Sequence, residues 1–208
     1  MNIFRVTVIR GGAAIPLDEV VELRSRYFYE DPLDPRYAVT GIHKKLSVDQ
    51  LRVSHEADWG SRYVLAFNPT GQLAGYLRLS VIEPGEKSQH LGIRHAVEPF
   101  VDSNLAQYAF LMTWIVMVSP EYQGRPVSFG GGPPMKVAEA LYDAALNHGA
   151  GNGARLALAD IYVSPSRNER SLALHHRLGF VTTDLAQIVE LRGGVEIVSE
   201  RLLRPITR

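Results

Sequence analysis

The sequence contains no cysteine. This absence excludes disulfide bonds, a thiolate nucleophile, and zinc or iron–sulfur sites built on cysteine, and we predict no metal site. An excess of charge is lacking too, because 22 Lys and Arg residues balance 22 Asp and Glu residues. No overall field draws the chain toward nucleic acid or an anionic membrane, so neither is an expected partner.

Long apolar stretches are also absent. The longest apolar run, residues 108–118, is far shorter than the ~20 residues that a membrane-spanning helix needs. The first ten residues contain Arg5 and Arg10 and have no long apolar core, so they do not resemble a secretory signal. We therefore expect a cytoplasmic protein that does not cross a membrane.

The composition that remains is that of an ordinary globular chain. Its 208 residues are 46% hydrophobic and 21% charged, which suits one large domain. Neither an internal repeat nor a low-complexity tract interrupts it. We predict a single α/β (α+β) domain over residues 1–208.

The first part of the chain predicts a strand, two helices and a hairpin. Residues 3–9 alternate as a half-buried strand does, and apolar residues recur at helical spacing after Pro16. Ser47 and Gln50 have the spacing of a capping box, which predicts a second helix. Two β-rich runs, 63–67 and 73–82, flank turn-forming residues 68–71 and predict a hairpin. Residues 84–107 are either a solvated loop or a segment that carries substrate specificity.

The second part predicts strands that alternate with helices. Residues 108–118 suit a central strand buried on both faces. A glycine-rich turn and a helix from Pro134 to Gly149 follow it, then a strand over 155–163. Ser166 and Glu169 predict the capping box of a short helix that Gly179 closes. Strands near 187–191 and 195–202 complete a mixed central sheet flanked by helices.

The glycine-rich turn is the first candidate for a ligand site. Gly130, Gly131 and Gly132 precede the predicted helix, and a helix start offers free N–H groups and a positive dipole end to a phosphate. Three glycines before a helix are also common in plain loops. The segment lacks the Gly-Lys-Ser/Thr of a nucleoside triphosphate loop, and it comes too late in the chain for a dinucleotide fold.

Two segments resemble the conserved blocks of one enzyme family. Residues Val116–Arg125 resemble the strand and pyrophosphate loop of GCN5-related N-acetyltransferases (GNAT). Residues Asn168–Phe180 resemble the second conserved block, and most closely that of the phosphinothricin acetyltransferase branch. The resemblance implies a sheet with splayed central strands, acetyl-CoA as cosubstrate, and direct attack by the amine of a small-molecule acceptor. It also implies a possible homodimer.

The resemblance assigns cofactor roles to particular residues. It implies that the backbone of Met117 and Val118 pairs with the pantetheine arm. Gln123, Gly124 and Arg125 would lie at the pyrophosphate. Asn168 would contact the pantetheine, or it would only begin a helix.

One departure from the family pattern affects this site. The family loop runs from Gln-Gly-Arg straight into Gly-x-Gly and the helix, whereas here residues 126–129 intervene. Pro126 also lacks an N–H group. We predict that the loop is lengthened and that Gly130, Gly131 and Gly132 restore the anion site at the helix start.

His175 stands where many relatives have the tyrosine that protonates the departing thiolate. Histidine can take that role because its ordinary pKa is about 6.5. The alternative is that His175 packs against the sheet while His176, about 100° around the helix, faces solvent. Neither Asp160 nor Glu83 stands out as a general base. Two other functions stay open: transfer of a different acyl group, and a silent CoA-binding domain.

Overall fold

The computed structural model describes residues 3–10, 15–26, 47–50, 61–83, 107–130, 132–164, 167–192 and 195–206. The predicted segment at 84–107 falls outside the described residues up to residue 106, and so does Gly131. The predicted capping box at Ser47 is confirmed. The Ser47 N–H donates to Gln50 Oε1 at 2.9 Å, and the Gln50 N–H donates to Ser47 Oγ at 3.2 Å.

The elements, in chain order, alternate much as expected. The first half comprises β1 (Arg5–Arg10), α1 (Leu17–Ser25), β2 (Ser61–Phe67), β3 (Leu73–Ile82) and β4 (Ala109–Val118). A short 3-10 helix, η2 (Pro120–Tyr122), then leads to β5 (Pro126–Val127) and β6 (Met135–Lys136). The remainder comprises α6 (Val137–Gly151), β7 (Ala154–Ser164), α7 (Glu169–Arg177), β8 (Val181–Arg192) and β9 (Val195–Pro205).

Seven strands form one sheet in the order β1-β2-β3-β4-β7-β9-β8. The predicted α+β class, a mixed sheet with flanking helices, is confirmed. The chain divides into two compact units. The first contains β1, α1, β2, most of β3, the second half of β4, and the β5–β6 hairpin with most of α6. The second contains the first half of β4, together with β7, α7, β8 and β9.

The first unit is built on an antiparallel meander. β1 pairs with β2, and β2 pairs with β3 across the predicted hairpin. Asn68 organises the turn, because its side-chain oxygen accepts from the N–H groups of Thr70 at 3.0 Å and Gln72 at 2.9 Å. This is an Asx turn, and it explains why a short polar segment is enough to reverse the chain.

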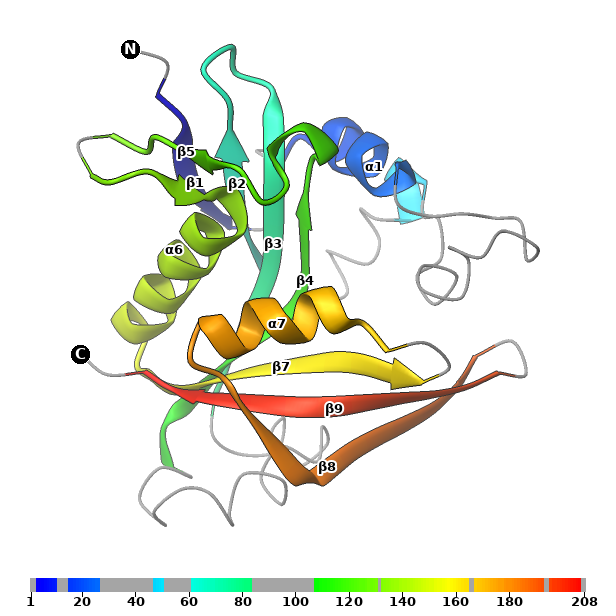
Figure 1. Cartoon of the computed structure of the whole chain (residues 1–208). Coiled ribbons are helices and arrows are strands. Elements are labelled where there is room, and N and C mark those ends of the chain that lie inside the picture. Colours follow the sequence, from blue (N-terminus) through cyan, green and yellow to red (C-terminus); the bar gives the residue numbers. More distant parts are fainter. Residues whose placement is uncertain are drawn as a thin grey trace. The chain divides into compact units, whose positions relative to one another are not determined.

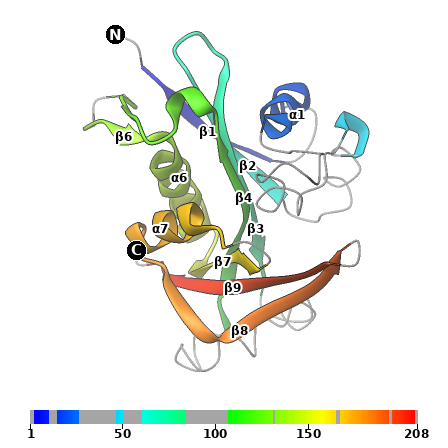
Figure 2. The same ribbon diagram turned by 45° about the vertical axis from the view of Figure 1, so that its right-hand side comes forward.

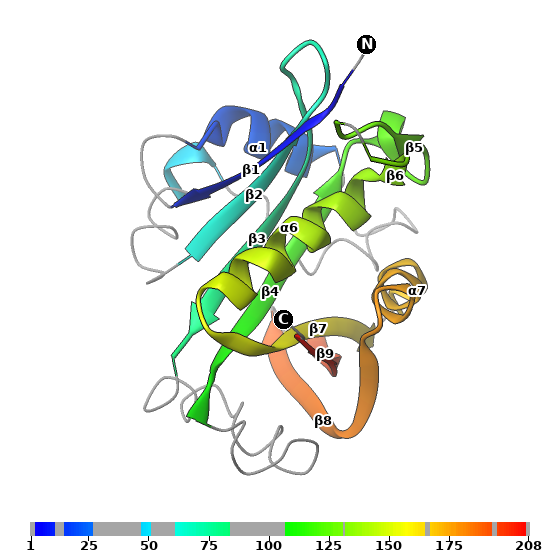
Figure 3. The ribbon, with the colours of Figure 1, turned by 90° about the vertical axis from the view of Figure 1, so that its left-hand side faces the viewer.

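The helices α1 and α6 cover opposite faces of the strands of the first unit (Figures 1 and 3). On one face, Val20 and Leu23 of α1 pack into a buried cluster with Tyr63, Leu65 and Tyr76. On the other, α6 begins over β3, where Val137 is fully buried. The apolar side chains of β2 and β3 therefore have a helix on each face.

β3 passes very close to β4 and α6 at Gly75. A Cβ atom at this position would lie 2.8 Å from the Met117 carbonyl oxygen and 3.2 Å from Val137 Cγ1. Contacts of this length between a Cβ and a backbone oxygen force the surroundings to move. Only glycine fits here without displacing the end of β4.

We therefore expect Gly75→Ala to lower the free energy of unfolding by about 1–3 kcal/mol, the usual cost of overpacking. Denaturant titration measures this loss. Gly151→Ala is the matched control, since its Cβ would meet nothing within 4 Å, and it should cost nothing. Equal stability of the two variants would show that the strands yield freely at Gly75.

Three strands of the second unit form an antiparallel layer, and a helix covers it. β9 pairs with β7 on one side and β8 on the other, and α7 lies against this layer (Figure 2). Its core joins side chains from β3, β4, β7 and β9, namely Ile82, Phe110, Met112, Leu156, Leu158 and Leu203. The predicted strands at 187–191 and 195–202 are confirmed as parts of the longer β8 and β9.

Candidate functional site

The loop after β4 begins where pairing with β3 ends. The Ser119 N–H donates to the Ala74 carbonyl at 2.8 Å, and η2 follows at once. Gly124 then adopts φ +72° with no atom within 4 Å of its Cβ position. Because L side chains rarely adopt this conformation, the Gln-Gly-Arg turn needs its glycine for backbone reasons. The Arg125 side chain that follows is exposed.

The end of β4 directs successive backbone groups to opposite sides. The Met117 carbonyl points at Gly75 of β3, and the Ser119 N–H donates to the same strand. Since the groups of a strand alternate, those of Val116 and Val118 point away from β3. Gln123 Nε2 donates to the Val118 carbonyl at 3.1 Å. Of the two residues predicted to offer backbone contacts, Met117 faces β3, and Val118 faces away from β3, where its carbonyl accepts from Gln123.

The second half of β4 is not buried on both faces, so that prediction is wrong. Trp114 is 38% exposed, and residues 115–118 are half-buried. Trp114 Nε1 donates to Ser80 Oγ at 3.0 Å, whereas Met117 Sδ lies 3.4 Å from the Tyr76 hydroxyl. These two contacts tie the second half of β4 to β3, while Trp114 stays partly exposed.

The lengthened loop forms a small hairpin, and this corrects the prediction for its glycines. Pro126 pairs with Lys136 and Val127 pairs with Met135, and α6 begins at Val137 rather than at Pro134. Gly130, with φ +68°, and Gly132 therefore belong to the connection between β5 and β6. They do not form the helix start, because the returning strand β6 separates them from it.

The hairpin places two other residues at the helix start. Lys136 is the register partner of Pro126, so it lies one position from Arg125 along the pairing. The Lys136 N–H donates to Glu139 Oε2 at 3.2 Å, and Lys136 Nζ lies 4.0 Å from Glu139 Oε1. Sequence reasoning missed both residues. The signal was the three-residue spacing of Lys136 and Glu139, since a Glu at the third helical position caps the backbone N–H at the helix start.

Asn168 is the N-cap of α7. Its side-chain oxygen accepts from the Ser171 N–H at 3.1 Å, and the helix begins at Glu169. The predicted capping box of Ser166 and Glu169 is therefore wrong, because Glu169 is the first helical residue instead of the third. The predicted end is confirmed, with Gly179 at φ +80°. Asn168 was expected either to contact the pantetheine or only to begin a helix. Its contacts are those of a residue that begins a helix.

We expect Asn168→Ala to lower the free energy of unfolding by about 1 kcal/mol, since the Ser171 N–H loses its acceptor. Asn168→Ser keeps a capping oxygen and should lose little. Chemical denaturation of both variants beside the wild type measures the difference. If the serine variant is as unstable as the alanine variant, loss of the capping hydrogen bond does not explain the loss of stability.

His175 lies inside the second unit. Its side chain is 1% exposed, its Nδ1 lies 2.7 Å from the Ser171 carbonyl oxygen, and its ring meets Phe180 edge to face with centroids 5.1 Å apart. The short contact to a carbonyl places the proton on Nδ1. Burial lowers the pKa of His175, against the raising effect of the bond to Ser171. His176 is exposed and lies 3.1 Å from the Thr182 hydroxyl. These contacts favour the packing interpretation over proton donation.

The lowered pKa predicts a pH-dependent stability. Unfolded His175 binds a proton near pH 6.5, whereas the folded side chain binds it only at lower pH. Its contribution is complete above about pH 6.5, and stability falls as the pH drops below that value by up to about 1.4 kcal/mol per pH unit. Unfolding titrations from pH 5 to 8 should show this slope reduced in His175→Phe and unchanged in His176→Gln. An identical slope in all three proteins would contradict the assignment.

Asp160, one of the carboxylates considered as a base, is held in an ion pair. Arg201 lies opposite it in the β7–β9 register and donates through Nε at 2.7 Å and Nη2 at 2.8 Å. Arg201 is only 4% exposed, so losing its partner would leave a buried charge unpaired. Asp160 is therefore a structural carboxylate.

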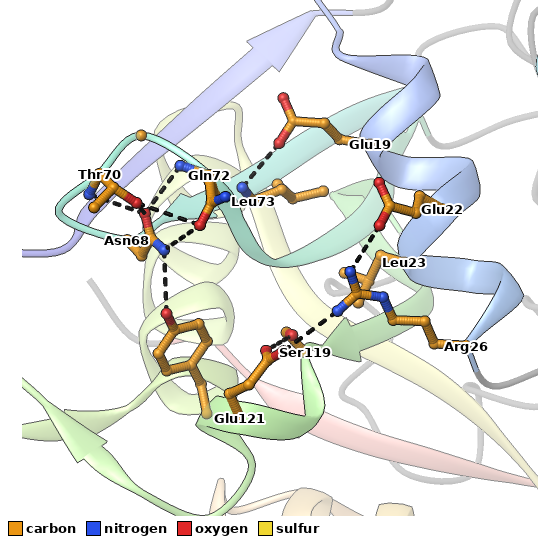
Figure 4. Close-up of a pocket in the computed structure, with 12 residues that line it drawn as sticks. Glu19, Glu22, Leu23, Arg26, Asn68, Thr70, Gln72, Leu73, Ser119 and Glu121 are labelled. Carbon is orange, nitrogen blue, oxygen red and sulfur yellow. Dashed lines mark hydrogen bonds and ion pairs between the residues drawn. The ribbon is translucent and has the colours of Figure 1, made fainter.

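The structure adds a pocket that the sequence did not predict. It has a volume of about 560 Å³ and lies in the first unit, among α1, the β2–β3 turn and η2. Figure 4 shows Arg26 between two carboxylates, Glu22 at 2.7 Å and Glu121 at 3.4 Å. The Ser119 hydroxyl donates to Glu121 and lowers the pKa of its carboxyl. Glu19 accepts from the Leu73 N–H at 2.9 Å. Each carboxylate of the pocket thus has a partner within the chain.

The structure of this chain is similar to several solved structures. Arabidopsis thaliana NAA60 in complex with acetyl-CoA matches with a TM-score of 0.62 and 12% identity, over 98% of this chain and 98% of that one. A Sinorhizobium meliloti GNAT phosphinothricin acetyltransferase in complex with acetyl-CoA matches with a TM-score of 0.58 and 19% identity, over 97% and 88%. An N-acetyltransferase from Staphylococcus aureus Mu50 matches with a TM-score of 0.60 and 12% identity, over 97% and 99%.

The chain has the GNAT fold. Neither a protein-family model nor a curated protein sequence matches it. Among the described residues of this GNAT fold, no group of three or more His, Cys, Asp or Glu side chains is placed to hold a metal ion. No helix in the described part of the chain has both the length and the apolar character to cross a membrane.

Proposed function

We propose that this protein is an acyl-CoA-dependent N-acyltransferase that moves an acetyl group from acetyl-CoA to the amine of a small-molecule acceptor. Two of the matching structures contain acetyl-CoA, and the fold supports the same cosubstrate here. The observation that carries the proposal is the turn at Gln123–Arg125, which follows the end of β4 and is brought beside the start of α6 by the β5–β6 pairing.

This turn has the chemistry that a pyrophosphate needs. Gly124 exposes backbone on a turn with no side chain over it, and Arg125 supplies an exposed guanidinium. The start of α6 adds the positive end of a helix dipole, and Lys136 adds an ammonium group. We place the pyrophosphate at these groups rather than at the glycines between β5 and β6. The half-buried end of β4, through the outward backbone groups of Val116 and Val118, is the proposed pantetheine contact.

The proposed reaction needs no covalent enzyme intermediate. The acceptor nitrogen attacks the thioester carbonyl, the C–S bond breaks, the ammonium loses a proton, and the CoA thiolate gains one. The chain contributes by holding the two substrates in position, which alone can lower a barrier by several kcal/mol. We do not assign His175 the role of proton donor to the thiolate. Its ring is buried and hydrogen-bonded within α7, and burial lowers its pKa.

Acetyl-CoA binding measured by calorimetry tests the proposed site. A charge-assisted hydrogen bond to a phosphate is worth about 1.5–3 kcal/mol, so Arg125→Ala should weaken binding roughly ten- to hundredfold. Arg5→Ala, which removes an exposed arginine from β1, is the charge-matched control and should bind like the wild type. Failure of the wild type to bind either acetyl-CoA or CoA would refute the proposal.

Turnover separates the remaining alternatives. Release of free CoA thiol is followed with a panel of small amines and with acetyl-, propionyl- and succinyl-CoA. Preference for a longer or acidic acyl group would correct the acyl assignment. Tight CoA binding without acyl consumption would indicate a binding domain that has lost turnover. Asn168→Ser, which keeps the cap, should retain binding if Asn168 only begins α7.

A further inference from the structure

Phe4 makes contacts that its place in the sequence does not suggest. It lies immediately before β1, yet its side chain is only 8% exposed. Its N–H donates to the Ser128 carbonyl at 2.9 Å, a backbone bond that belongs to neither helix nor sheet. Phe4 is thus fixed through both its backbone and its ring.

The ring of Phe4 contacts residues on either side of the Gln123–Arg125 turn. It meets Tyr122 edge to face, with centroids 5.1 Å apart and planes at 83°. It also meets Phe129, with centroids 5.6 Å apart and planes at 59°. Tyr122 immediately precedes the turn, and Phe129 follows it within the hairpin. The ring of Phe4 therefore contacts both the residue before the turn and a residue of the hairpin that follows it.

Tyr122 is held at its hydroxyl as well. Asn68 Nδ2 donates to that oxygen at 3.1 Å, and Asn68 is itself fixed by the Asx turn between β2 and β3. Asn68 is 6% exposed although it belongs to a turn. The aromatic contact at Phe4 thus rests on a rigid part of the meander.

The segment between these anchors has little rigidity of its own. β5 and β6 share only the two pairs Pro126–Lys136 and Val127–Met135, and a hairpin of that length is not stable alone in water. Gly124 and Gly130 add flexible backbone at φ +72° and +68°. Contacts from outside the hairpin must therefore fix the position of Arg125 and Lys136.

We infer that Phe4, through Tyr122 and Phe129, is a positioning residue for the pyrophosphate loop of this chain. The inference rests on the proposed function. The β5–β6 pairing brings the loop beside the start of α6, and the aromatic cluster of Phe4, Tyr122 and Phe129 fixes the loop to the start of β1 and to the β2–β3 turn. Phe4 touches no part of the proposed cofactor; it acts on the loop that does.

Acetyl-CoA and S-acetyl-pantetheine, which lacks the pyrophosphate and the nucleotide attached to it, test this role. Phe4→Ala should weaken acetyl-CoA binding about three- to tenfold, as expected from the loss of one well-placed aromatic contact. It should leave the affinity for S-acetyl-pantetheine, which has no phosphate, unchanged in an NMR titration. Phe4→Leu keeps most of the apolar volume and should recover part of the lost acetyl-CoA affinity. Phe110→Leu, in the core of the second unit, is the control for general destabilisation and should leave the ratio of the two affinities unchanged.

A measurement without ligand makes the outcome independent of the cofactor. Hydrogen–deuterium exchange of the peptide spanning residues 119–137 should be faster in Phe4→Ala than in Phe110→Leu. Equal weakening for both ligands, or none for acetyl-CoA, would overturn the positioning role. If the wild type binds neither ligand, the proposed function fails, and unchanged exchange in Phe4→Ala would then overturn the positioning of the loop as well.

Discussion

The close passage of β3 beneath the end of β4 and the start of α6 is the constraint on which the candidate site depends. At Gly75 there is no room for a Cβ, since the Met117 carbonyl oxygen and Val137 Cγ1 already occupy that space. The contact holds the end of β4 and the start of α6 against β3. The Gln123–Arg125 turn follows the end of β4, so its position depends on this steric limit one strand away.

Residues inserted into the loop between β4 and α6 must leave the end of β4 and the start of α6 in place. The chain meets this requirement by pairing Pro126, the first inserted residue, with Lys136, the last residue before α6. The extra residues then project as a hairpin without moving Arg125 away from the helix. Adding residues to a closed loop costs little entropy once its ends are fixed, because the cost grows only with the logarithm of length. Pro126 fits this position because it begins a short strand, where a missing N–H is tolerated.

Local patterns in the sequence predicted the helices and strands well. The features that they failed to predict depend on interactions between residues far apart in the sequence. Periodicity and turn residues are short-range signals, so the β2–β3 hairpin, β4, β7 and the capping box at Ser47 could be read from them. The exposure of Trp114 could not be predicted in this way. A strand that is apolar throughout has the same sequence pattern whether or not a neighbouring element covers its second half.

The candidate site shows the same division. Gln123, Gly124 and Arg125 form the turn that the family resemblance implied, and Gly124 has a positive φ there. The glycines at 130–132 suggested a helix start, but β6 pairing moved that start to Val137. A three-residue spacing suggested a cap at Ser166, although Asn168 lies closer to the first buried residue of α7, Leu172, and forms the cap. His175 stands at a position typical of a proton donor, and only the fold shows that its ring is enclosed beside Phe180.

The neutral charge balance of the chain makes the local arrangement at α6 the decisive electrostatic feature. With 22 basic and 22 acidic residues, no long-range field concentrates an anionic ligand, so any attraction must come from within about a Debye length of 8–10 Å. Arg125 and Lys136 meet that condition because the hairpin brings them within one register position of each other. Glu139 limits their effect, since it accepts from the Lys136 N–H and lies near its ammonium group. A phosphate at this helix start would compete with Glu139 for the same donors, and the balance between the two carboxylate oxygens and the phosphate sets how tightly such a ligand is held.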